Sequence, residues 1–289
     1  MQRRGALSLI GGALALTRCS PTNAVQIGSK NFTESFLLAE LYAQQLERAG
    51  ISVVRRFNLG STEILLAALT RGEIDCYPEY TGTALVDVLH HAPLRNESAV
   101  LSLLRHAFVE RYRATWLDPA PMNDSQALAT TRAISSRLNL RTLSECARLA
   151  PQLRLATIQE FLARPDGLPG LKAAYGGFDF KSIHTYDIAL KYAALLSGDA
   201  DVATAFTTDG AIAAHELVVL RDDRGFWPTY HAAPVVRQEV LARSPRIRTL
   251  LDRLSATLTT ARVRAMNERI EAQQQSPAIV ARAFLASMR

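Results

Sequence analysis

The fold is indicated by the stretch Ala68-Leu69-Thr70-Arg71-Gly72-Glu73-Ile74-Asp75-Cys76-Tyr77-Pro78-Glu79-Tyr80-Thr81-Gly82-Thr83. A second copy begins 126 positions later (68 to 194) and reads Ala194-Leu195-Leu196-Ser197-Gly198-Asp199-Ala200-Asp201-Val202-Ala203-Thr204-Ala205-Phe206-Thr207. In each copy an apolar helix would end at a glycine, which adopts the left-handed conformation without steric cost. An acidic pair and a short strand follow, and the strand ends on an aromatic residue. Because ligands of open α/β sheets bind at the carboxyl ends of strands, the repeat predicts two similar α/β lobes. Each lobe would present one aromatic side chain to a shared cleft.

Length and composition describe an ordinary globular protein. The chain has 289 residues, 48% hydrophobic and 21% charged, which is enough for one or two domains with sizeable cores. The formal net charge of +6 includes Arg3, Arg4 and Arg18, so removing residues 1–24 leaves 30 basic against 27 acidic residues, or +3. Such a small and evenly spread excess does not indicate a nucleic-acid partner.

The first 24 residues have the pattern of a signal peptide, with two arginines, an apolar core from Ala6 to Leu16 and a small-residue exit. The apolar core is too short to span a bilayer. Two endings remain open. A lipobox-like Leu16-Thr17-Arg18-Cys19 would place a lipid on Cys19, whereas Thr22-Asn23-Ala24 offers cleavage before Val25. Since Arg18 stands where a lipobox has a small residue, we favour the second ending and expect a periplasmic protein.

The first hundred residues predict a β-α-β-α-β run. Val25 to Gly28 alternates like a strand, and Asn31 followed by Glu34 has the spacing of a capping box that opens a helix ending at Gly50. A strand over Ile51–Leu59 and a Ser61-capped helix follow. Lys30 would then lie at a strand-to-helix turn, where free backbone N–H groups favour an anion.

Two irregular, proline-containing segments predict where the chain crosses between the lobes. These are Trp116 to Asp124 and Gly225 to Tyr230. The predicted layout is therefore a signal peptide (1–24), a first part of lobe 1 (25–123), lobe 2 (124–227) and a return segment of lobe 1 (228–289). A helix at Pro277, capped by Ser276, would close the chain.

The sequence contains no recognisable catalytic, metal-binding or phosphate-binding motif. The histidines lack metal-ligand spacing, and Cys76 and Cys146 are interpreted as isolated thiols in or near the core. We therefore expect a binding protein without metal or cofactor. Spacing alone would place Phe206 in a core and Lys30 and Arg164 at the surface.

At Gly28-Ser29-Lys30-Asn31-Phe32-Thr33-Glu34 and at Tyr77-Pro78-Glu79-Tyr80-Thr81-Gly82-Thr83 the chain resembles a known family. This family comprises the substrate-binding proteins of ABC importers for glycine betaine, choline and related quaternary ammonium compounds. The resemblance spans essentially the whole mature chain and continues through 160–167, 205–210 and 227–234. It implies a type II periplasmic-binding-protein fold, in which two α/β lobes close around the ligand.

The resemblance also implies which residues bind the ligand. A quaternary ammonium group cannot donate hydrogen bonds, so it is held by ring faces and apolar contact. The positions similar to the family's aromatic cage are Tyr80, Phe206 and Tyr230, with a backbone carbonyl near Asp124. The family's carboxylate clamp falls on Lys30, Thr83 and Arg164, and a guanidinium matches a carboxylate with two parallel hydrogen bonds. Gln126 stands where the family often has another tyrosine. Tyr77, Tyr186 and Tyr192 are expected in the cores, with Tyr77 nearest to the rim of the site.

Several alternatives stay open. The same fold occurs in enzymes and in receptor sensor domains, and the ligand could be glycine betaine, choline, carnitine, proline betaine or a non-quaternary solute. The expected partners are an ABC permease and its ATPase, and the protein itself is expected to be a monomer. Membrane contact would occur through the permease or through a lipid on Cys19.

Overall fold

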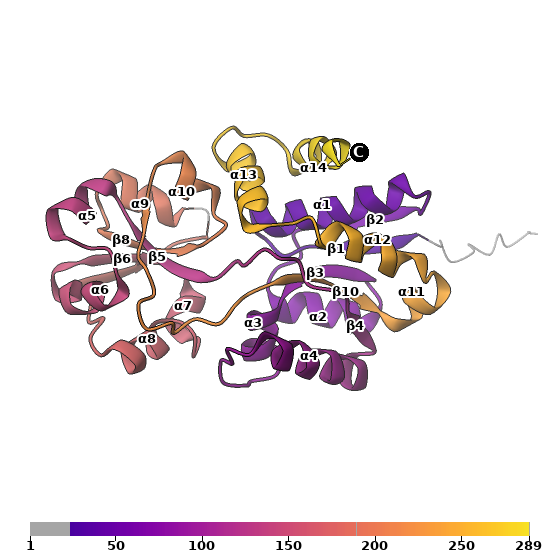
Figure 1. The fold of residues 1–289 in the computed structure, drawn as a ribbon, viewed down its shortest axis with the longest axis horizontal. Coiled ribbons are helices and arrows are strands. Elements are labelled where there is room, and N and C mark those ends of the chain that lie inside the picture. Colours follow the sequence, from indigo (N-terminus) through magenta and orange to yellow (C-terminus); the bar gives the residue numbers. More distant parts are fainter. Residues whose placement is uncertain (1–23, 189, 289) are drawn as a thin grey trace, which may run out of the picture.

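The protein consists of two α/β lobes connected by two extended segments (Figure 1). A computed structural model describes residues 24–188 and 190–288, so the predicted signal peptide, apart from Ala24, lies outside the described residues. Each lobe is built on a five-stranded sheet covered by helices on both faces. The α/β fold class expected from the repeat is confirmed.

Lobe 1 contains the sheet with strand order β2-β1-β3-β10-β4. β1 is parallel to β2 and β3, whereas β10 runs antiparallel to β3 and β4. The strands are β1 (Val25–Gly28), β2 (Val53–Arg56), β3 (Cys76–Tyr80), β4 (Ala114–Trp116) and β10 (Ala232–Arg237). The helices are α1 (Thr33–Arg48), α2 (Thr62–Arg71), α3 (Thr81–Thr83), the π-helical turn η1 (Ala84–Val88), α4 (Glu97–Tyr112), α11 (Gln238–Arg243), α12 (Arg246–Ser255), α13 (Thr260–Glu271) and α14 (Pro277–Ser287).

Lobe 2 repeats this plan in the order β7-β6-β8-β5-β9. β6 is parallel to β7 and β8, and β5 is antiparallel to β8 and β9. The strands are β5 (Gln126–Thr130), β6 (Arg154–Thr157), β7 (Ser182–Thr185), β8 (Val202–Phe206) and β9 (Val218–Val219). The helices are α5 (Arg132–Leu138), α6 (Leu143–Leu149), the 3₁₀ turn η2 (Ala150–Gln152), α7 (Gln159–Ala163), α8 (Leu168–Tyr175), α9 (Lys191–Ser197) and α10 (Gly210–Ala214).

The two copies of the repeat form the same structure in the two lobes. Gly72 after α2 and Gly198 after α9 both have left-handed backbone, with φ of 73° and 83°. Each leads into the central strand of its sheet, β3 or β8. At the start of these strands, the carboxylate of Asp75 accepts the backbone N–H of Gln26 at 3.0 Å, and that of Asp201 accepts the backbone N–H of Arg154 at 2.9 Å. The acidic residue of each copy therefore ties the central strand to its parallel neighbour.

Two chain segments connect the lobes and run side by side. The first passes from β4 to β5 and the second from β9 to β10. Backbone hydrogen bonds join them, from Leu117 to Pro234 (3.0 Å), from Ala120 to Ala232 (2.8 Å) and from Asp124 to Tyr230 (3.0 Å). Figure 1 shows both segments passing between the lobes, which places the ends of β3, β5 and β8 near the space that the lobes share.

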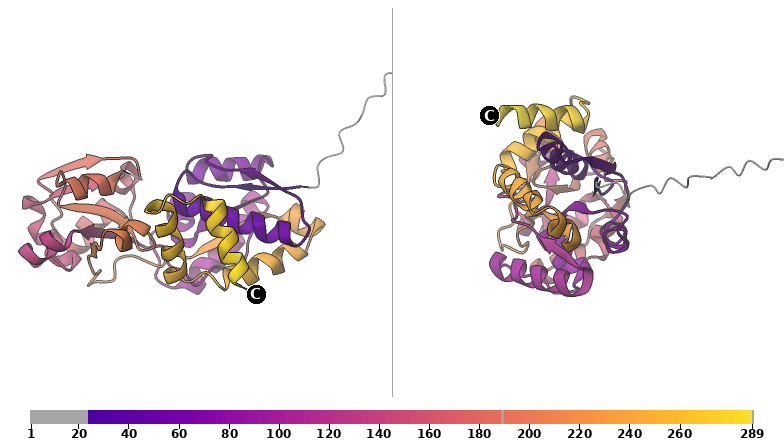
Figure 2. Two further views of the ribbon diagram at one scale, coloured as in Figure 1. Left: turned by 90° about the horizontal axis from the view of Figure 1, so that it is seen from above. Right: turned by 90° about the vertical axis from the view of Figure 1, so that its right-hand side faces the viewer.

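The cores lie on the two faces of each sheet. In lobe 1, α1 packs on α12, α13 and α14 on one side, as the view from above in Figure 2 shows. The fully buried Trp116 packs edge-on against Phe108 on the other, at 5.3 Å between ring centroids. Cys76 and Cys146 are both buried and unbonded, as expected. Among the described residues, no helix is both long and apolar enough to cross a bilayer.

Several sequence expectations need correction. The strand expected over 51–59 is shorter, because Asn58 and Gly60 have positive φ values of 60° and 128° that end the extended backbone. The alanine-rich β5 and the polar α13 were not anticipated. β5 shows no apolar–polar alternation, and most residues of α13 are polar or charged, with Val263, Met266 and Ile270 on its inner face.

Candidate functional site

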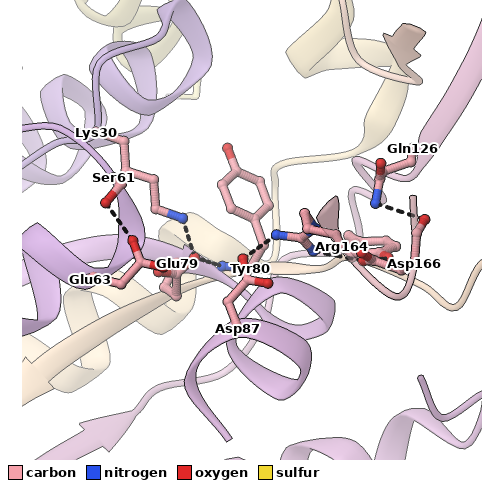
Figure 3. A network of polar contacts seen from close by, with 10 residues as sticks. Lys30, Ser61, Glu63, Glu79, Tyr80, Asp87, Gln126, Arg164 and Asp166 are labelled. Carbon is pink, nitrogen blue, oxygen red and sulfur yellow. Dashed lines mark hydrogen bonds and ion pairs between the residues drawn. The ribbon is translucent and has the colours of Figure 1, made fainter. Parts of the chain in front are cut away.

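A cavity of about 900 Å³ lies between the lobes. Its walls come from the turn after β1, the start of α1, the ends of β3 and β8, the crossing segments, and helices α7, α9, α10 and α13. The carboxyl ends of the two central strands, β3 and β8, therefore face the same cavity, as the repeat predicted. Figure 3 shows the polar side of this cavity.

The structure brings all eight residues predicted for ligand binding to the walls of this cavity. They come from both lobes and from both crossing segments. These residues are Lys30, Tyr80, Thr83, Asp124, Gln126, Arg164, Phe206 and Tyr230.

Aromatic side chains form much of the cavity wall. Tyr80 ends β3 and Phe206 ends β8, so the repeat itself places these two rings. The ring of Tyr230 lies so close to Gly82 that a Cβ atom at that glycine would be 2.4 Å from the tyrosine Cε1. The remaining aromatic residues of the wall are Phe32, Phe36, Phe161, Tyr186 and Tyr192. This surface suits a ligand that binds through ring faces.

One face of the Phe206 ring already contacts a cation of the protein itself, the ammonium group of Lys191. The buried Lys191 ammonium lies 4.4 Å from the centroid of the Phe206 ring and 5.0 Å from that of Tyr192. Asp209 holds it at 3.1 Å and also accepts hydrogen bonds from the Tyr192 hydroxyl (2.5 Å) and from the backbone N–H of Phe206 (2.9 Å). The wall around Phe206 is therefore rigidly held by this carboxylate.

Two buried carboxylates, those of Glu34 and Asp124, face the cavity and are held by neutral donors. Glu34 accepts hydrogen bonds from the Tyr80 hydroxyl at 2.7 Å and from the Asn267 amide at 2.8 Å. Asp124 accepts one from the Thr208 hydroxyl at 2.5 Å. Burial raises the pKa of Glu34, and burial together with the nearby Glu34 also raises the pKa of Asp124. A cationic ligand would supply the positive charge that these two groups lack.

Acidic groups outnumber basic ones in the cavity wall. Of the described lining residues, two carry a permanent positive charge, Lys30 and Arg164. Eight carry a carboxylate: Glu34, Glu63, Asp87, Asp124, Glu160, Asp187, Asp209 and Glu271. The cavity is thus complementary to a cation in its electrostatics as well as in its aromatic surface.

Both of these basic side chains are already paired with acids. The Lys30 ammonium lies 2.5 Å from the fully buried Glu79 carboxylate, and 5.3 Å from the centroid of the Tyr80 ring. Arg164 forms a two-point ion pair with Asp166 and a further one with Asp87 (Figure 3). Burial opposes the Arg164 charge, but its acidic partners raise the arginine pKa above its usual value. Asp166 in turn accepts a hydrogen bond from the Tyr230 hydroxyl.

Gln126 is connected to the same network of hydrogen bonds. Its side-chain amide lines the cavity and donates to the backbone carbonyl of Asp166 at 3.2 Å (Figure 3). The indole of Trp227 donates to the same carbonyl at 2.8 Å. The amide is therefore held in place and presents a polar surface where a ring would be apolar.

Several residues that line the cavity were not identified from the sequence, and Glu34 was assigned a wrong role. The predicted capping box of Asn31 and Glu34 is wrong, because the helix begins at Thr33 without a side-chain cap. The Glu34 carboxylate instead points inward to Tyr80. The expectation that Tyr77 approaches the rim is also wrong, since it is fully buried in the lobe 1 core. Tyr192 lies in a lobe 2 core with Tyr186 packed against it, as expected, but both residues also line the cavity.

The signal for the missed acids was present in the quoted motifs. Glu34 and Asp209 belong to stretches that carry the resemblance, as does Asp166. Each of them follows within a few residues of a predicted ligand-binding side chain. Asp87 lies outside those motifs, and it reaches the site only because the chain turns back through η1 after β3.

Comparison with known proteins identifies the family. Residues 23–287 match the model of the substrate-binding domain of ABC-type glycine betaine transport systems. The chain belongs to this family. It is therefore a solute-binding domain and not an enzyme, in agreement with the sequence expectation. The matched range covers both lobes and every residue of the cavity wall.

Named relatives and a solved structure agree with this assignment. A glycine-betaine-binding protein of Pseudomonas aeruginosa is 33% identical over 96% of this chain and 92% of its own length. A carnitine transport binding protein of Listeria monocytogenes is 28% identical over 96% of this chain and 93% of its own. The crystal structure of a glycine betaine/carnitine/choline ABC transporter is 30% identical, has a TM-score of 0.78, and matches over 91% of this chain and 98% of that one. The two-lobed binding-protein fold is thus shared with this family of transport proteins.

Proposed function

We propose that this substrate-binding domain captures a quaternary ammonium compound, such as glycine betaine or choline, in the cavity between its lobes. The observation that carries the proposal is the combination of an aromatic wall with two buried carboxylates, Glu34 and Asp124, that are held by neutral donors. A quaternary ammonium group has no N–H to donate, so it gains most from ring faces and from nearby negative charge.

Each predicted residue has a role in this proposal. Tyr80, Phe206 and Tyr230 surround the ammonium head, and the carboxylates of Glu34 and Asp124 balance its charge. Gln126 gives one side of the cavity a polar surface. If the ligand has a carboxylate tail, Lys30, Thr83 and Arg164 receive it.

We further propose that the domain acts outside the cytoplasm, as a periplasmic monomer that delivers its ligand to an ABC permease and the associated ATPase. Membership of a family of ABC-type substrate-binding domains supports this arrangement. The N-terminal pattern of arginines and apolar residues supports export.

A calorimetric screen tests the proposed function. Protein beginning at Val25 is titrated with glycine betaine, choline, carnitine and proline betaine, and with arginine as a cation that is not quaternary. We expect saturable binding of at least one quaternary compound and none of arginine. No binding of any quaternary compound, or tighter binding of arginine, would exclude the proposal.

A matched pair of variants tests the aromatic cage. Tyr80→Leu removes the ring and should weaken binding by about 0.5–2 kcal/mol, the range for a cation–π contact. Tyr80→Phe keeps the ring and removes the hydrogen bond to Glu34, so it should retain most of the affinity. Equal losses in the two variants would show that the hydroxyl matters and that the ring face does not.

A further inference from the structure

Arg164 has two edges that can each hold a carboxylate, and one of them is occupied from within lobe 2. A guanidinium presents one pair of donors at Nε and one Nη, and a second pair at the two Nη atoms. Arg164 donates through Nε to Oδ1 of Asp166 at 2.7 Å and through Nη2 to Oδ2 at 2.6 Å. Asp166 is fully buried and also accepts from the Tyr230 hydroxyl, so this side of the guanidinium is held by the framework of the site.

The other edge of Arg164 is occupied by a residue of lobe 1. Its Nη1 atom is ion-paired with Oδ2 of Asp87, which lies in η1 shortly after the cavity-lining Tyr80 and Thr83. Asp87 lines the cavity and its side chain is 19% exposed, against 0% for Asp166. Figure 3 shows Asp87 and Asp166 approaching the guanidinium from different directions. Asp87 is therefore the acid on the cavity side of Arg164.

We propose that Asp87 occupies the position on Arg164 that a ligand carboxylate would take, and that it thereby sets the preference between quaternary cations with and without a carboxylate. This inference rests on the proposed function. A zwitterion such as glycine betaine must displace Asp87 from this edge of Arg164 or place its own carboxylate beside that of Asp87. A cation such as choline binds with the Asp87–Arg164 pair intact.

The remaining basic group of the wall does not relieve this competition. The Lys30 ammonium can receive a ligand carboxylate only while it stays paired with Glu79, whose side chain is fully buried and whose Oε1 also accepts the backbone N–H of Tyr80 at 2.8 Å. Pulling Lys30 away would leave a buried carboxylate without its counter-charge, which is costly. Asp87 is easier to displace, because burial and the nearby Asp166 and Glu63 raise its pKa to about 6 against the opposing effect of Arg164 and Lys30.

Substitution of Asp87 tests the proposal. Asp87→Asn keeps the shape of the side chain and removes its charge, so the edge of Arg164 that Asp87 occupies becomes available to a ligand carboxylate. We expect glycine betaine to bind about tenfold tighter relative to choline than it does to the parent protein, a change of 1.4 kcal/mol in relative binding free energy. Calorimetric titration of both ligands at one pH and salt concentration measures this ratio.

Glu160→Gln is the matched control, because it also removes one negative charge from the cavity wall. The backbone N–H of Arg164 donates to the Glu160 carbonyl at 3.0 Å, but among the described residues the Glu160 carboxylate makes no hydrogen bond to the Arg164 guanidinium. It should change the affinities of the two ligands by the same factor. Asp87→Ala provides a second variant of different shape, and thermal unfolding shows that each protein is folded.

The outcomes separate this inference from the proposed function. If the parent protein binds no quaternary compound of the screen, the proposed function fails and this inference fails with it. If it binds another quaternary compound but neither glycine betaine nor choline, the proposed function stands and this inference fails. If the parent binds but neither Asp87→Asn nor Asp87→Ala raises the preference for glycine betaine, only the role of Asp87 is overturned. An equal shift in Glu160→Gln would assign the effect to overall charge and would also overturn it.

Discussion

At the scale of single residues, the cavity is defined by carboxylates placed where water cannot fully solvate them. Glu271 illustrates the consequence. It ends α13, and its Oε2 accepts the backbone N–H of Ala211 at 3.1 Å. Burial, with Asp209 and Glu34 nearby, raises its pKa to about 7, although the Ala211 N–H and the Lys191 charge act in the opposite direction. Near neutral pH this group is therefore divided between its charged and neutral forms.

The titration of Glu271 predicts how binding responds to pH. An acid with a raised pKa weakens the folded state as pH rises from the usual carboxyl range toward 7, because the unfolded chain loses its proton first. A cation bound in the cavity instead stabilises the charged form of the Glu271 carboxylate. We therefore expect choline affinity to rise between about pH 6 and pH 8, with release of a proton on binding. Titration in two buffers of different ionisation enthalpy measures the protons released.

Glu271→Gln is the control for the pH prediction, since it cannot titrate and keeps a side-chain oxygen for Ala211. In this variant the affinity for choline should change less with pH near pH 7. Any change with pH that remains would come from Asp87, Glu34 and Asp124. Proton uptake on choline binding, or a parent-like slope in Glu271→Gln, would contradict the assignment.

Sequence reasoning found the rings of the site more readily than its acids. Tyr80 and Phe206 end the central strands, and strand position is readable from a repeat. Glu34 has the spacing of a helix-capping residue, and its inward direction depends on Tyr80 and Asn267, which lie 46 and 233 positions away. Such partners are not visible in a local pattern.

At the scale of elements, the two repeat copies show what local patterns predict well. The left-handed Gly72 and Gly198 end their helices as expected, and both central strands follow them. Strand β5 was missed because Gln126–Thr130 is buried throughout and carries small residues, so it has no alternation to read. Its place is set by pairing with β8, which is tertiary information.

The packing of α3 against the second crossing segment predicts a binding defect from a small substitution. Gly82→Ala would place a Cβ atom 2.4 Å from Cε1 and 2.5 Å from Cδ1 of Tyr230, so the ring must move. If the ring then leaves the ligand, affinity should fall by about 0.5–2 kcal/mol, as for loss of a cation–π contact. Calorimetry with the tightest ligand of the screen measures the loss.

The control for Gly82 is the glycine of the second repeat copy. Gly198→Ala meets open space but has a φ of +83°, so it should cost stability of about 1–2 kcal/mol without changing affinity. Parent-like affinity in Gly82→Ala would mean that Tyr230 adjusts without consequence for the ligand.

At the scale of the whole molecule, the lobes touch beyond their crossing segments. The N-terminal end of α10 in lobe 2 packs on α13, which belongs to the lobe 1 helices. The Arg264 guanidinium donates to the Thr207 carbonyl at 2.9 Å, and the Asn267 amide donates to the Thr208 carbonyl at 3.0 Å. This contact holds the lobes together on the same side as Glu34 and Glu271.

Gly210 allows this close approach, and its substitution should open the molecule. A Cβ atom there would lie 2.4 Å from the Glu268 backbone nitrogen and 2.6 Å from the Asn267 carbonyl carbon. Since these are backbone atoms, α10 must move off α13. We expect Gly210→Ala to have a larger radius of gyration in solution scattering and weaker ligand binding. Gly50→Ala, at a positive φ with open space, is the control and should change neither. An unchanged radius of gyration in Gly210→Ala would contradict this view.

The excess of carboxylates around the cavity also has a kinetic consequence. A cleft lined by one sign of charge attracts oppositely charged solutes and raises their association rate, and the attraction weakens as salt shortens the Debye length to about 3 Å at 1 M. Contacts with rings inside the cavity act at shorter range and are screened less. In concentrated salt, a quaternary cation should therefore reach the cavity more slowly while its residence time changes little. Added salt would then lower the association rate before it raises the dissociation rate.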